Sequence, residues 1–290
     1  MRKLLASELI LNEDGSIYHL NLRPAQIADT IITVGDPDRV NEVTKHFDEI
    51  ECTVSRREFK TTTGTYKKKR ISVISTGIGT DNIDIVLNEL DALVNIDFKQ
   101  RTIKPTLTSL DIIRIGTSGS IQKDIEVGSL LVSTKAIGLD GMIHSYDSQA
   151  VRDVKLEDAF IRQTQWSSDK ARPYVIEAAP ELLEKFTDAP FLPGFTATFN
   201  GFYGAQARSL RLSLQDQSLH EKIEAFSLNK ERITNLEMET AGIYGLAALL
   251  GHKAISLNAI LANRVKGEFS SNTQKTVEEL IVLTLEKLIE

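Results

Sequence analysis

The sequence has one cysteine, Cys52, among its 290 residues. A single cysteine excludes an internal disulfide framework and any metal site built from several cysteines, and it is typical of a reducing compartment. Positive charge is also scarce, because 34 Lys and Arg stand against 40 Asp and Glu, for a formal net charge of -6. Nucleic-acid-binding proteins usually carry a basic face, so binding to DNA or RNA is not expected.

Long apolar runs are absent as well. The longest, at residues 241–250, is far shorter than the ~20 residues that cross a bilayer. Near the start of the sequence, Arg2 and Lys3 precede an apolar stretch, but Glu8 interrupts it and no small-residue cleavage site follows. We therefore expect a cytoplasmic protein with no membrane contact.

Three common motifs are missing. The five histidines are scattered without an HExxH pattern, so a catalytic zinc is not expected. Neither a GxGxxG dinucleotide fingerprint nor a GxxxxGK[ST] P-loop occurs, and the Gly-Ile-Gly at 77–79 is too short to replace them. Chemistry based on these motifs is therefore not predicted.

What the sequence does contain is a regular alternation of short β-branched runs with helical patterns, which predicts an α/β fold with a parallel or mixed sheet. With 41% hydrophobic residues and no repeat or linker, we expect a single domain over residues 1–290. Strands are expected at 30–34, 71–76, 111–115, 129–134, 195–199, 233–236 and 254–261. Helices are expected at 37–47, 83–93, 175–186, 240–250 and 273–289. Residues 52–75 read as a hairpin, 97–109 as a polar surface excursion and 138–170 as irregular.

An arginine, Arg114, lies inside the apolar strand expected at 111–115. Burying a guanidinium without a partner is very costly, so Arg114 must meet an anion. Ligands of open α/β sheets bind beyond the carboxyl ends of strands, where the small residues at 116–119 would let backbone N–H groups and the Thr117 hydroxyl approach a phosphate. A structural ion pair with an internal carboxylate explains Arg114 equally well, and both explanations stay open.

A second arginine, Arg39, falls in the first helical turn after Gly35-Asp36-Pro37, where the helix dipole disfavours a cation. A bound anion would remove this penalty. Pairing with Asp36 or Asp38 is the alternative for Arg39 taken alone. Two such arginines, each after a different strand, favour a phosphate site.

Two carboxylates, Glu237 and Glu239, come between an expected strand and an expected helix and lie on one side if the chain is extended. A carboxylate can accept both hydrogens of a vicinal diol. Stabilisation of the helix start through its dipole is one alternative, and a glycosidase-like acid/base pair is another.

The loop at 201–208 combines aromatic rings with a planar amide, Gln206, and a planar guanidinium, Arg208. These groups stack on a nucleobase and hydrogen-bond its edge. Without further context, an ordinary surface loop is the alternative.

Taken in order, five segments resemble the nucleoside phosphorylase family: residues 35–39, 55–59, 75–79, 114–119 and 237–239. The resemblance runs from Tyr18 to the end of the sequence and is closest to the members that cleave uridine. It implies a three-layer α/β/α sandwich around a central mixed β-sheet. It also implies the phosphorolysis of uridine by inorganic phosphate, without a metal or organic cofactor.

The resemblance further implies a set of residues for each part of the substrates. The residues for phosphate are Gly35, Arg39, Arg114 and Thr117, with Arg57 supplied by a neighbouring subunit. The residues for ribose are Glu237, Met238 and Glu239, with His19 reaching the 5'-hydroxyl across the interface. The residues for uracil are Phe202, Gln206, Arg208 and Arg264. The catalytic residues among these are Arg114, Glu239 and Arg208. Glu58 resembles a position that can bind a monovalent cation, K⁺, at a subunit interface.

Three alternatives stay open. Residues 237–245 are close to those of bacterial purine nucleoside phosphorylases, but the region in which those enzymes carry a Ser-Asp pair, whose acid protonates the purine, reads Ala262-Asn263-Arg264 here. A nucleosidase of the same fold would use water and would have no need of three arginines around an anion. A non-catalytic nucleoside-binding or storage protein is the third alternative. Because two site residues are expected from a neighbour, we expect a homo-oligomer, a dimer at least and a hexamer as the larger assembly.

Overall fold

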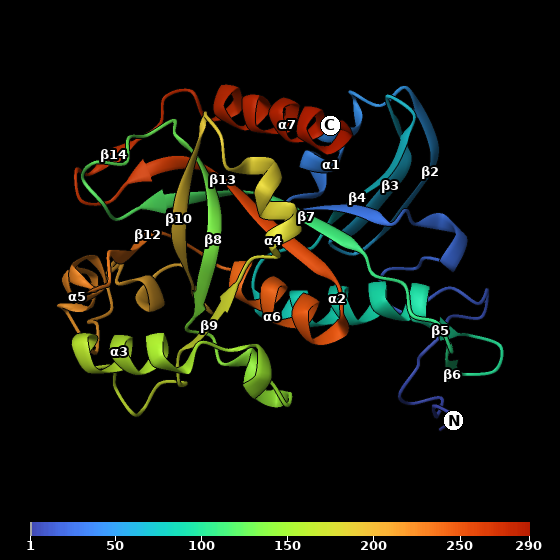
Figure 1. Ribbon diagram of the computed structural model, residues 1–290, viewed down its shortest axis with the longest axis horizontal. Helices are drawn as coiled ribbons and strands as arrows, with labels where there is room; N and C mark the ends of the chain where they lie inside the picture. Colours follow the sequence, from blue (N-terminus) through green and yellow to red (C-terminus); the bar gives the residue numbers. More distant parts are fainter. Residues whose placement is uncertain (1) are drawn as a thin grey trace.

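The β-branched runs form one mixed sheet of twelve strands in a computed structural model that describes residues 2–290 (Figure 1). Its main path runs β11-β12-β10-β8-β13-β7-β1-β4-β3-β2, with β9 paired to β8 and β14 paired to β13. The strands are β1 (Thr30–Val34), β2 (Glu49–Arg56), β3 (Phe59–Tyr66), β4 (Lys69–Ser75), β7 (Asp111–Ser120), β8 (Leu130–Gly138), β9 (Tyr174–Glu177), β10 (Phe191–Thr198), β11 (Ser227–Leu228), β12 (Glu231–Glu237), β13 (Lys253–Asn263) and β14 (Glu268–Phe269).

Helices cover both faces of this sheet, which confirms the predicted three-layer α/β/α class (Figure 1). On one face lie α1 (Pro37–Thr44), α4 (Pro180–Leu183) and α7 (Thr273–Ile289). On the other lie α2 (Thr80–Asn95), α6 (Thr240–Leu250), α3 (Val154–Thr164) and α5 (Leu219–Ala225). No helix among residues 2–290 is both long and apolar enough to cross a membrane.

The long helix α2 shows how apolar spacing predicted helices from the sequence. Ile83, Val86, Leu87 and Leu90 recur at intervals of three and four residues, and all four side chains are buried against the sheet. The apolar stripe therefore fixes which face of α2 packs inward.

Five strands of the sheet close into a ring. β12 pairs in parallel with β10 and also antiparallel with β7, through Asn235↔Ser120 and Leu236↔Gly119. Since β10, β8, β13 and β7 are consecutive neighbours, the second pairing of β12 joins the two ends of this path. The ring brings the functional residues of β7 and β12 close together.

Three expectations for the chain are wrong in detail. Residues 175–186 do not form one helix, because Val175 and Ile176 are buried in β9 beside β8, and a helix starts only at Pro180. Residues 116–119 are not a loop, because β7 continues to Ser120 with β13 as a partner along its whole length. In the stretch expected to be irregular, residues 154–164 form α3.

The polar excursion at 97–109 begins within a small hairpin, β5 (Ile96–Asp97) and β6 (Thr102–Ile103). Within it, the Arg101 guanidinium donates to the carbonyl oxygens of Leu4, at 3.0 Å, and Leu5, at 2.8 Å. The excursion therefore anchors the first residues of the chain.

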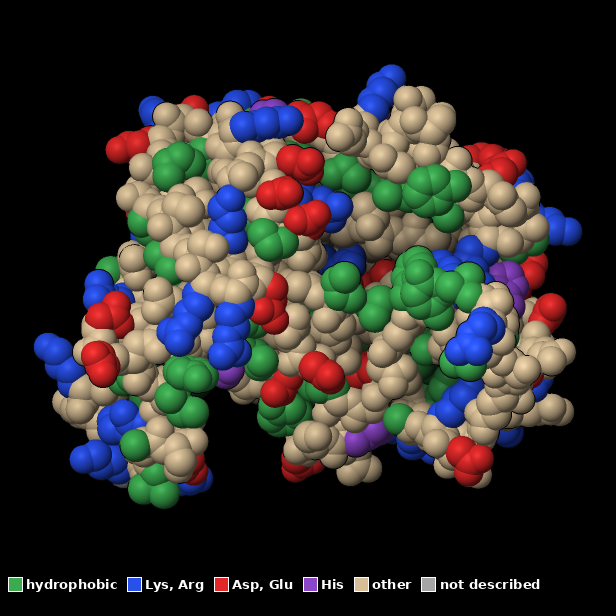
Figure 2. Space-filling view, turned by 180° about the vertical axis from the view of Figure 1, so that it is seen from behind, with side chains coloured by type: hydrophobic (Ala, Val, Ile, Leu, Met, Phe, Trp, Pro, Cys, Tyr) green, Lys and Arg blue, Asp and Glu red, His purple; other side chains and the backbone are tan. Residues whose placement is uncertain are grey.

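Charge is mixed over the surface. On the face shown in Figure 2, Lys and Arg side chains lie interspersed with Asp and Glu side chains, and no continuous basic patch covers it. The same face is hollowed near its centre, where hydrophobic side chains border a few charged ones.

Candidate active site

A cavity of about 990 Å³ gathers residues from both ends of the chain. It contains every site residue expected from the sequence except His19 and Arg57. The expected residues that line it are Gly35, Arg39, Glu58, Arg114, Thr117, Phe202, Gln206, Arg208, Glu237, Met238, Glu239 and Arg264. Segments more than 200 residues apart in the sequence thus meet in one place.

Arg39 lies at one end of the cavity, on the first turn of α1. The turn is capped by Asp36, which accepts the N–H of Asp38 at 2.8 Å. The nearest carboxylate oxygen to Arg39, on Glu42, is 3.9 Å away, and the buried Nε of Arg39 has no hydrogen-bond partner. Burial lowers the pKa of Arg39, and repulsion from Arg114 adds to this effect although Glu42 opposes it. A half-buried guanidinium that makes no hydrogen bond and has one carboxylate at 3.9 Å, beside a second guanidinium, is an arrangement that an anion would stabilise.

Arg114 is buried and paired. Its Nη2 lies 2.6 Å from Glu239 and 3.1 Å from Glu237, and its Nη1 donates to Asn258 at 3.1 Å. Burial opposes the charge, but the two carboxylates outweigh it and raise the pKa of Arg114 above its usual value. The internal ion pair left open by the sequence therefore exists, and Arg114 also faces the cavity.

Glycine at position 116 is required by Arg114. A Cβ atom on Gly116 would lie 1.8 Å from Nη1 of Arg114. Because two carboxylates hold that guanidinium, it has little freedom to move aside. Thr117, the next residue of β7, also lines the cavity.

Glu237 has a structural role. Its carboxylate accepts the Thr198 hydroxyl at 2.5 Å and the backbone N–H groups of Glu239 and Thr240, each at 2.9 Å. These bonds satisfy N–H groups at the start of α6. Glu237 thus orients α6 and Arg114, and it also lines the cavity.

Glu239 is placed differently. Its Oε1 accepts the backbone N–H of Gly79 at 2.8 Å, and its Oε2 accepts from Arg114. Each oxygen keeps a further lone pair that can accept a hydroxyl. Burial raises the pKa of Glu239, an effect that Arg114 partly offsets and Glu237 increases.

The opposite end of the cavity is built by the 201–208 loop and β13. The Arg208 guanidinium lies 3.9 Å over the Phe202 ring and donates from Nη1 to the Phe202 carbonyl and to Oε1 of Gln206. From the end of β13, Arg264 donates to the Gln206 carbonyl at 2.5 Å. Burial, followed by repulsion from Arg208, lowers the pKa of Arg264 to about 10. The buried Nε2 of Gln206 has no partner.

Asn263, in the acid-free segment 262–264, is fully buried. Its Nδ2 donates to the carbonyls of Gln122 and Ile125, each at 2.9 Å. Its Oδ1 accepts the N–H groups of Val265, at 3.1 Å, and Lys266, at 2.9 Å. All four hydrogen-bonding positions of the amide are used within the chain.

The comparisons with known proteins agree with this geometry. A sequence profile of the Phosphorylase superfamily matches residues 29–290. The chain belongs to this superfamily. It is 31% identical over 285 residues to a uridine phosphorylase of Thermococcus kodakarensis, covering 95% of this chain and 87% of the relative. It is 28% identical over 270 residues to a DeoD-type purine nucleoside phosphorylase of Bacillus subtilis, covering 92% and 97%.

A solved structure is similar throughout. The crystal structure of a Trypanosoma brucei nucleoside phosphorylase, described as showing uridine phosphorylase activity, superposes with a TM-score of 0.86 at 29% identity. The match covers 97% of this chain and 99% of the other. The family and the fold expected from the sequence are therefore confirmed.

His19 and Arg57 lie outside the cavity. The His19 ring is held by Glu89, with Nδ1 2.6 Å from Oε1. Arg57 is exposed at the turn between β2 and β3, with φ of 55°, and makes no hydrogen bond or ion pair within residues 2–290. Its neighbour Glu58 does line the cavity, so the turn carrying Arg57 stands at the mouth of the site.

Several residues that shape the cavity were not expected from the sequence. Asn258 binds Arg114 from β13, and the N–H of Gly79 binds Glu239. Asn82, at the start of α2, and the exposed Phe269, on β14, also line the cavity. Of these residues, only Gly79 stood out in the sequence, as the second glycine of Gly77-Ile78-Gly79 after β4.

Proposed function

We propose that this protein is a uridine phosphorylase, which converts uridine and phosphate reversibly to uracil and ribose 1-phosphate. One observation carries the proposal. A single cavity has Arg39, whose Nε has no hydrogen-bond partner, at one end, Gln206, whose Nε2 has none, at the other, and the Glu239 carboxylate near Arg114. This arrangement suits an anion, a planar base and a diol.

In this proposal phosphate lies near Arg39, Arg114, Gly35 and Thr117. Cleavage of the glycosidic bond develops positive charge on the ribose, which the bound phosphate stabilises before it attacks C1' with inversion. Glu239 accepts the ribose hydroxyls, and Met238 packs against the sugar. Since Arg114 and Glu239 hold each other, phosphate and ribose are aligned by one ion pair.

Uracil leaves as an anion whose charge spreads over its carbonyl oxygens. Gln206 is oriented for this base, because Arg208 donates to its Oε1 and leaves Nε2 free to donate to a carbonyl. A second lone pair on Oε1 can accept the N3–H of uracil. Phe202 provides a face for the ring, and Arg208 and Arg264 supply positive charge. Cytosine has an acceptor at N3 and would fit this pattern poorly.

The similarity to purine nucleoside phosphorylases makes inosine the main competing substrate. Residues 262–264 argue against it, because they hold no acid that could protonate a purine, and the Asn263 amide is fully engaged by the backbone. A hydrolytic nucleosidase is disfavoured by Arg39, whose guanidinium makes no hydrogen bond within residues 2–290 and would have no phosphate to hold.

The proposal includes a shared site. His19 and Arg57 are absent from the cavity of their own chain, and each would complete the cavity of a neighbouring subunit in a homo-oligomer, either a dimer or a hexamer. We propose that no metal or organic cofactor takes part in the chemistry. A K⁺ ion beside Glu58 at the subunit interface would be structural.

The test is the ultraviolet absorbance change of uridine, measured with and without phosphate and repeated with cytidine and inosine. We expect turnover that requires phosphate and favours uridine by several orders of magnitude. Cleavage without phosphate would indicate a nucleosidase. Comparable turnover of inosine would indicate a purine enzyme. Binding of nucleosides without any turnover would indicate a storage protein.

A further inference from the structure

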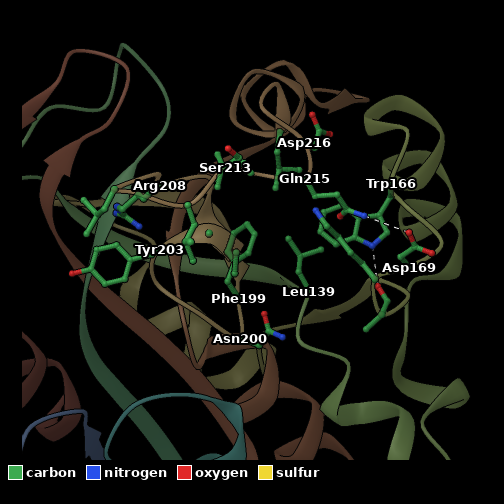
Figure 3. A pocket seen from close by; sticks show the side chains of 18 of the residues that line it. Leu139, Trp166, Asp169, Phe199, Asn200, Tyr203, Arg208, Ser213, Gln215 and Asp216 are labelled. Atoms are coloured by element: carbon green, nitrogen blue, oxygen red, sulfur yellow. Dashed lines mark hydrogen bonds between the residues drawn. The ribbon is translucent and has the colours of Figure 1, made fainter.

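A second cavity, of about 770 Å³, lies on the other side of the 201–208 loop (Figure 3). Its floor is formed by the buried side chains of Leu139, Phe199 and Leu219. Among residues 2–290, only Arg208 lines both this cavity and the active-site cavity. In Figure 3 Arg208 and Tyr203 lie at one end and Trp166 and Asp169 at the other.

The segment 209–215 borders this cavity with an unusual pattern. Leu210, Leu212 and Leu214 alternate with polar residues, which is typical of a half-buried strand. The segment forms neither strand nor helix, and Leu210 and Leu212 are 82% and 73% exposed although both line the cavity. Two exposed leucines beside an apolar floor can gain stability by moving onto it.

The segment is fixed at its two ends and loosely held between them. At one end Arg264 binds the carbonyls of Gln206 and Ala207, and at the other Asp216 accepts from Lys222 at 2.8 Å. Between these anchors the side-chain bonds are a hydrogen bond from Ser209 to the Leu212 carbonyl and a long one, 3.4 Å, from Gln215 to Asp169. So few restraints allow residues 209–215 to move as a unit.

We propose that residues 209–215 form a lid that closes on the second cavity when a base occupies the active site. The inference rests on the proposed function. Arg208 turns from the Phe202 carbonyl toward the base, Ser209 follows it, and Leu210 and Leu212 pack over Leu139 and Phe199. The two leucines are then positioning residues, because they act on the base only by holding Arg208.

The single tryptophan of the chain, Trp166, lies in the wall of the second cavity and reports closure directly. With the wild-type protein, uracil plus phosphate should shift the Trp166 emission to shorter wavelength, excited where uracil does not absorb. The same ligands should slow tryptic cleavage after the exposed Arg211. A Trp166→Phe variant is the control for the emission change.

Variants separate a positioning role from a structural one. Leu212→Ser should abolish the emission shift and raise KM for uridine about tenfold with kcat little changed, since closure contributes binding that is common to ground state and transition state. Leu212→Met, in which the new side chain has a similar volume, should keep the wild-type KM for uridine. Leu192→Ser, at an exposed leucine on β10 that lines neither cavity, is the matched control.

The lid proposal is wrong if the enzyme cleaves uridine but saturating uracil and phosphate change neither the Trp166 emission nor the rate of tryptic cleavage after Arg211. It is also wrong if protection of Arg211 depends on protein concentration and not on ligand, which would place a second copy over the leucines. Failure of the proposed function is distinguishable, because uridine would then not be phosphorolysed at all.

Discussion

Arg114 and Glu239 form an ion pair inside the active-site cavity, with Nη2 2.6 Å from Oε2. Arg114 is expected to hold phosphate and Glu239 to hold the ribose diol. Their pairing aligns the two groups in the free protein, so that little reorganisation is needed when substrates bind.

The two arginines of the phosphate end should respond differently to removal. Arg114→Ala should lower kcat/KM at least ~10²-fold and reduce the free energy of unfolding by about 3–5 kcal/mol, because two buried carboxylates lose their partner. Arg39→Ala should raise KM for phosphate with little change in Tm, because its one carboxylate neighbour, Glu42, is 3.9 Å away and partly exposed to solvent. Steady-state kinetics with varied phosphate and thermal unfolding measure both. Normal phosphate dependence in both variants would contradict the assignment.

Gly116→Ala should reduce activity by about as much as the loss of Arg114, because the new Cβ would occupy the position of Nη1. Gly119→Ala is the matched control for stability, since its Cβ would lie 3.7 Å from the nearest atoms, an ordinary contact. Thermal unfolding and kcat/KM should separate the two. A fully active Gly116→Ala variant would show that Arg114 can leave its place without consequence.

Placing an acid at position 263 should not create a purine enzyme. Asn263→Asp replaces a donor by an oxygen that faces the carbonyls of Gln122 and Ile125. We expect the free energy of unfolding to fall by at least about 2 kcal/mol, with no gain in inosine turnover. Chemical denaturation and the inosine assay measure this. A stable variant that cleaves inosine would overturn the framework role of Asn263.

The pH dependence of kcat/KM should report Glu239. Burial raises the pKa of this carboxyl above the ordinary value of 4.5, so Glu239 takes up a proton as the pH falls through that raised pKa. Its ion pair and its hydroxyl acceptor are then lost. We expect an acid limb at higher pH than an ordinary glutamate gives, and its disappearance in Glu239→Gln, while any limb from phosphate itself remains. An identical limb in both proteins would assign it elsewhere.

Subunit sharing can be tested by complementation. Arg57→Ala and Glu239→Gln should each impair every site of a homo-oligomer. In a mixed dimer, the subunit that keeps Glu239 receives Arg57 from its partner, so one site is whole. Co-expression should recover substantial activity, measured on hetero-oligomers verified by two affinity tags. Verified hetero-oligomers without recovery, or an active monomer in light scattering, would exclude the shared site.

Local patterns predicted much of the fold. In α2, the spacing of the apolar residues shows which face of the helix is buried against the sheet. In β1 and β4, the β-branched runs indicate strands that lie in the buried sheet. Residues 175–186 were misassigned because Val175 and Ile176 are apolar neighbours that suit a helix or a strand, and only the position of β8 decides between them.

The site was predictable where the chemistry of one side chain was unusual. Arg39 stood out because the helix dipole disfavours a cation in the first turn of a helix. Arg114 stood out because an apolar strand is a costly place for a charge. Asn258 did not, because its contact with Arg114 depends on the register of β13 against β7, in which Ser256 pairs with Arg114. A role for Glu237 at the start of α6 was among the alternatives, but its bond to Thr198 could not be predicted, since Thr198 lies on a third strand.

The closed ring of β7, β13, β8, β10 and β12 has a consequence for how such a protein can diversify. Arg114, Glu237 and Asn263 are carried by strands whose main-chain hydrogen bonds continue around the ring, so none of them can shift without disturbing its neighbours. Gln206 and Arg208, which we propose contact the base, stand on a loop outside the ring. Substitutions in this loop can therefore alter contacts to the base while the strands that carry Arg114 and Glu237 stay in place.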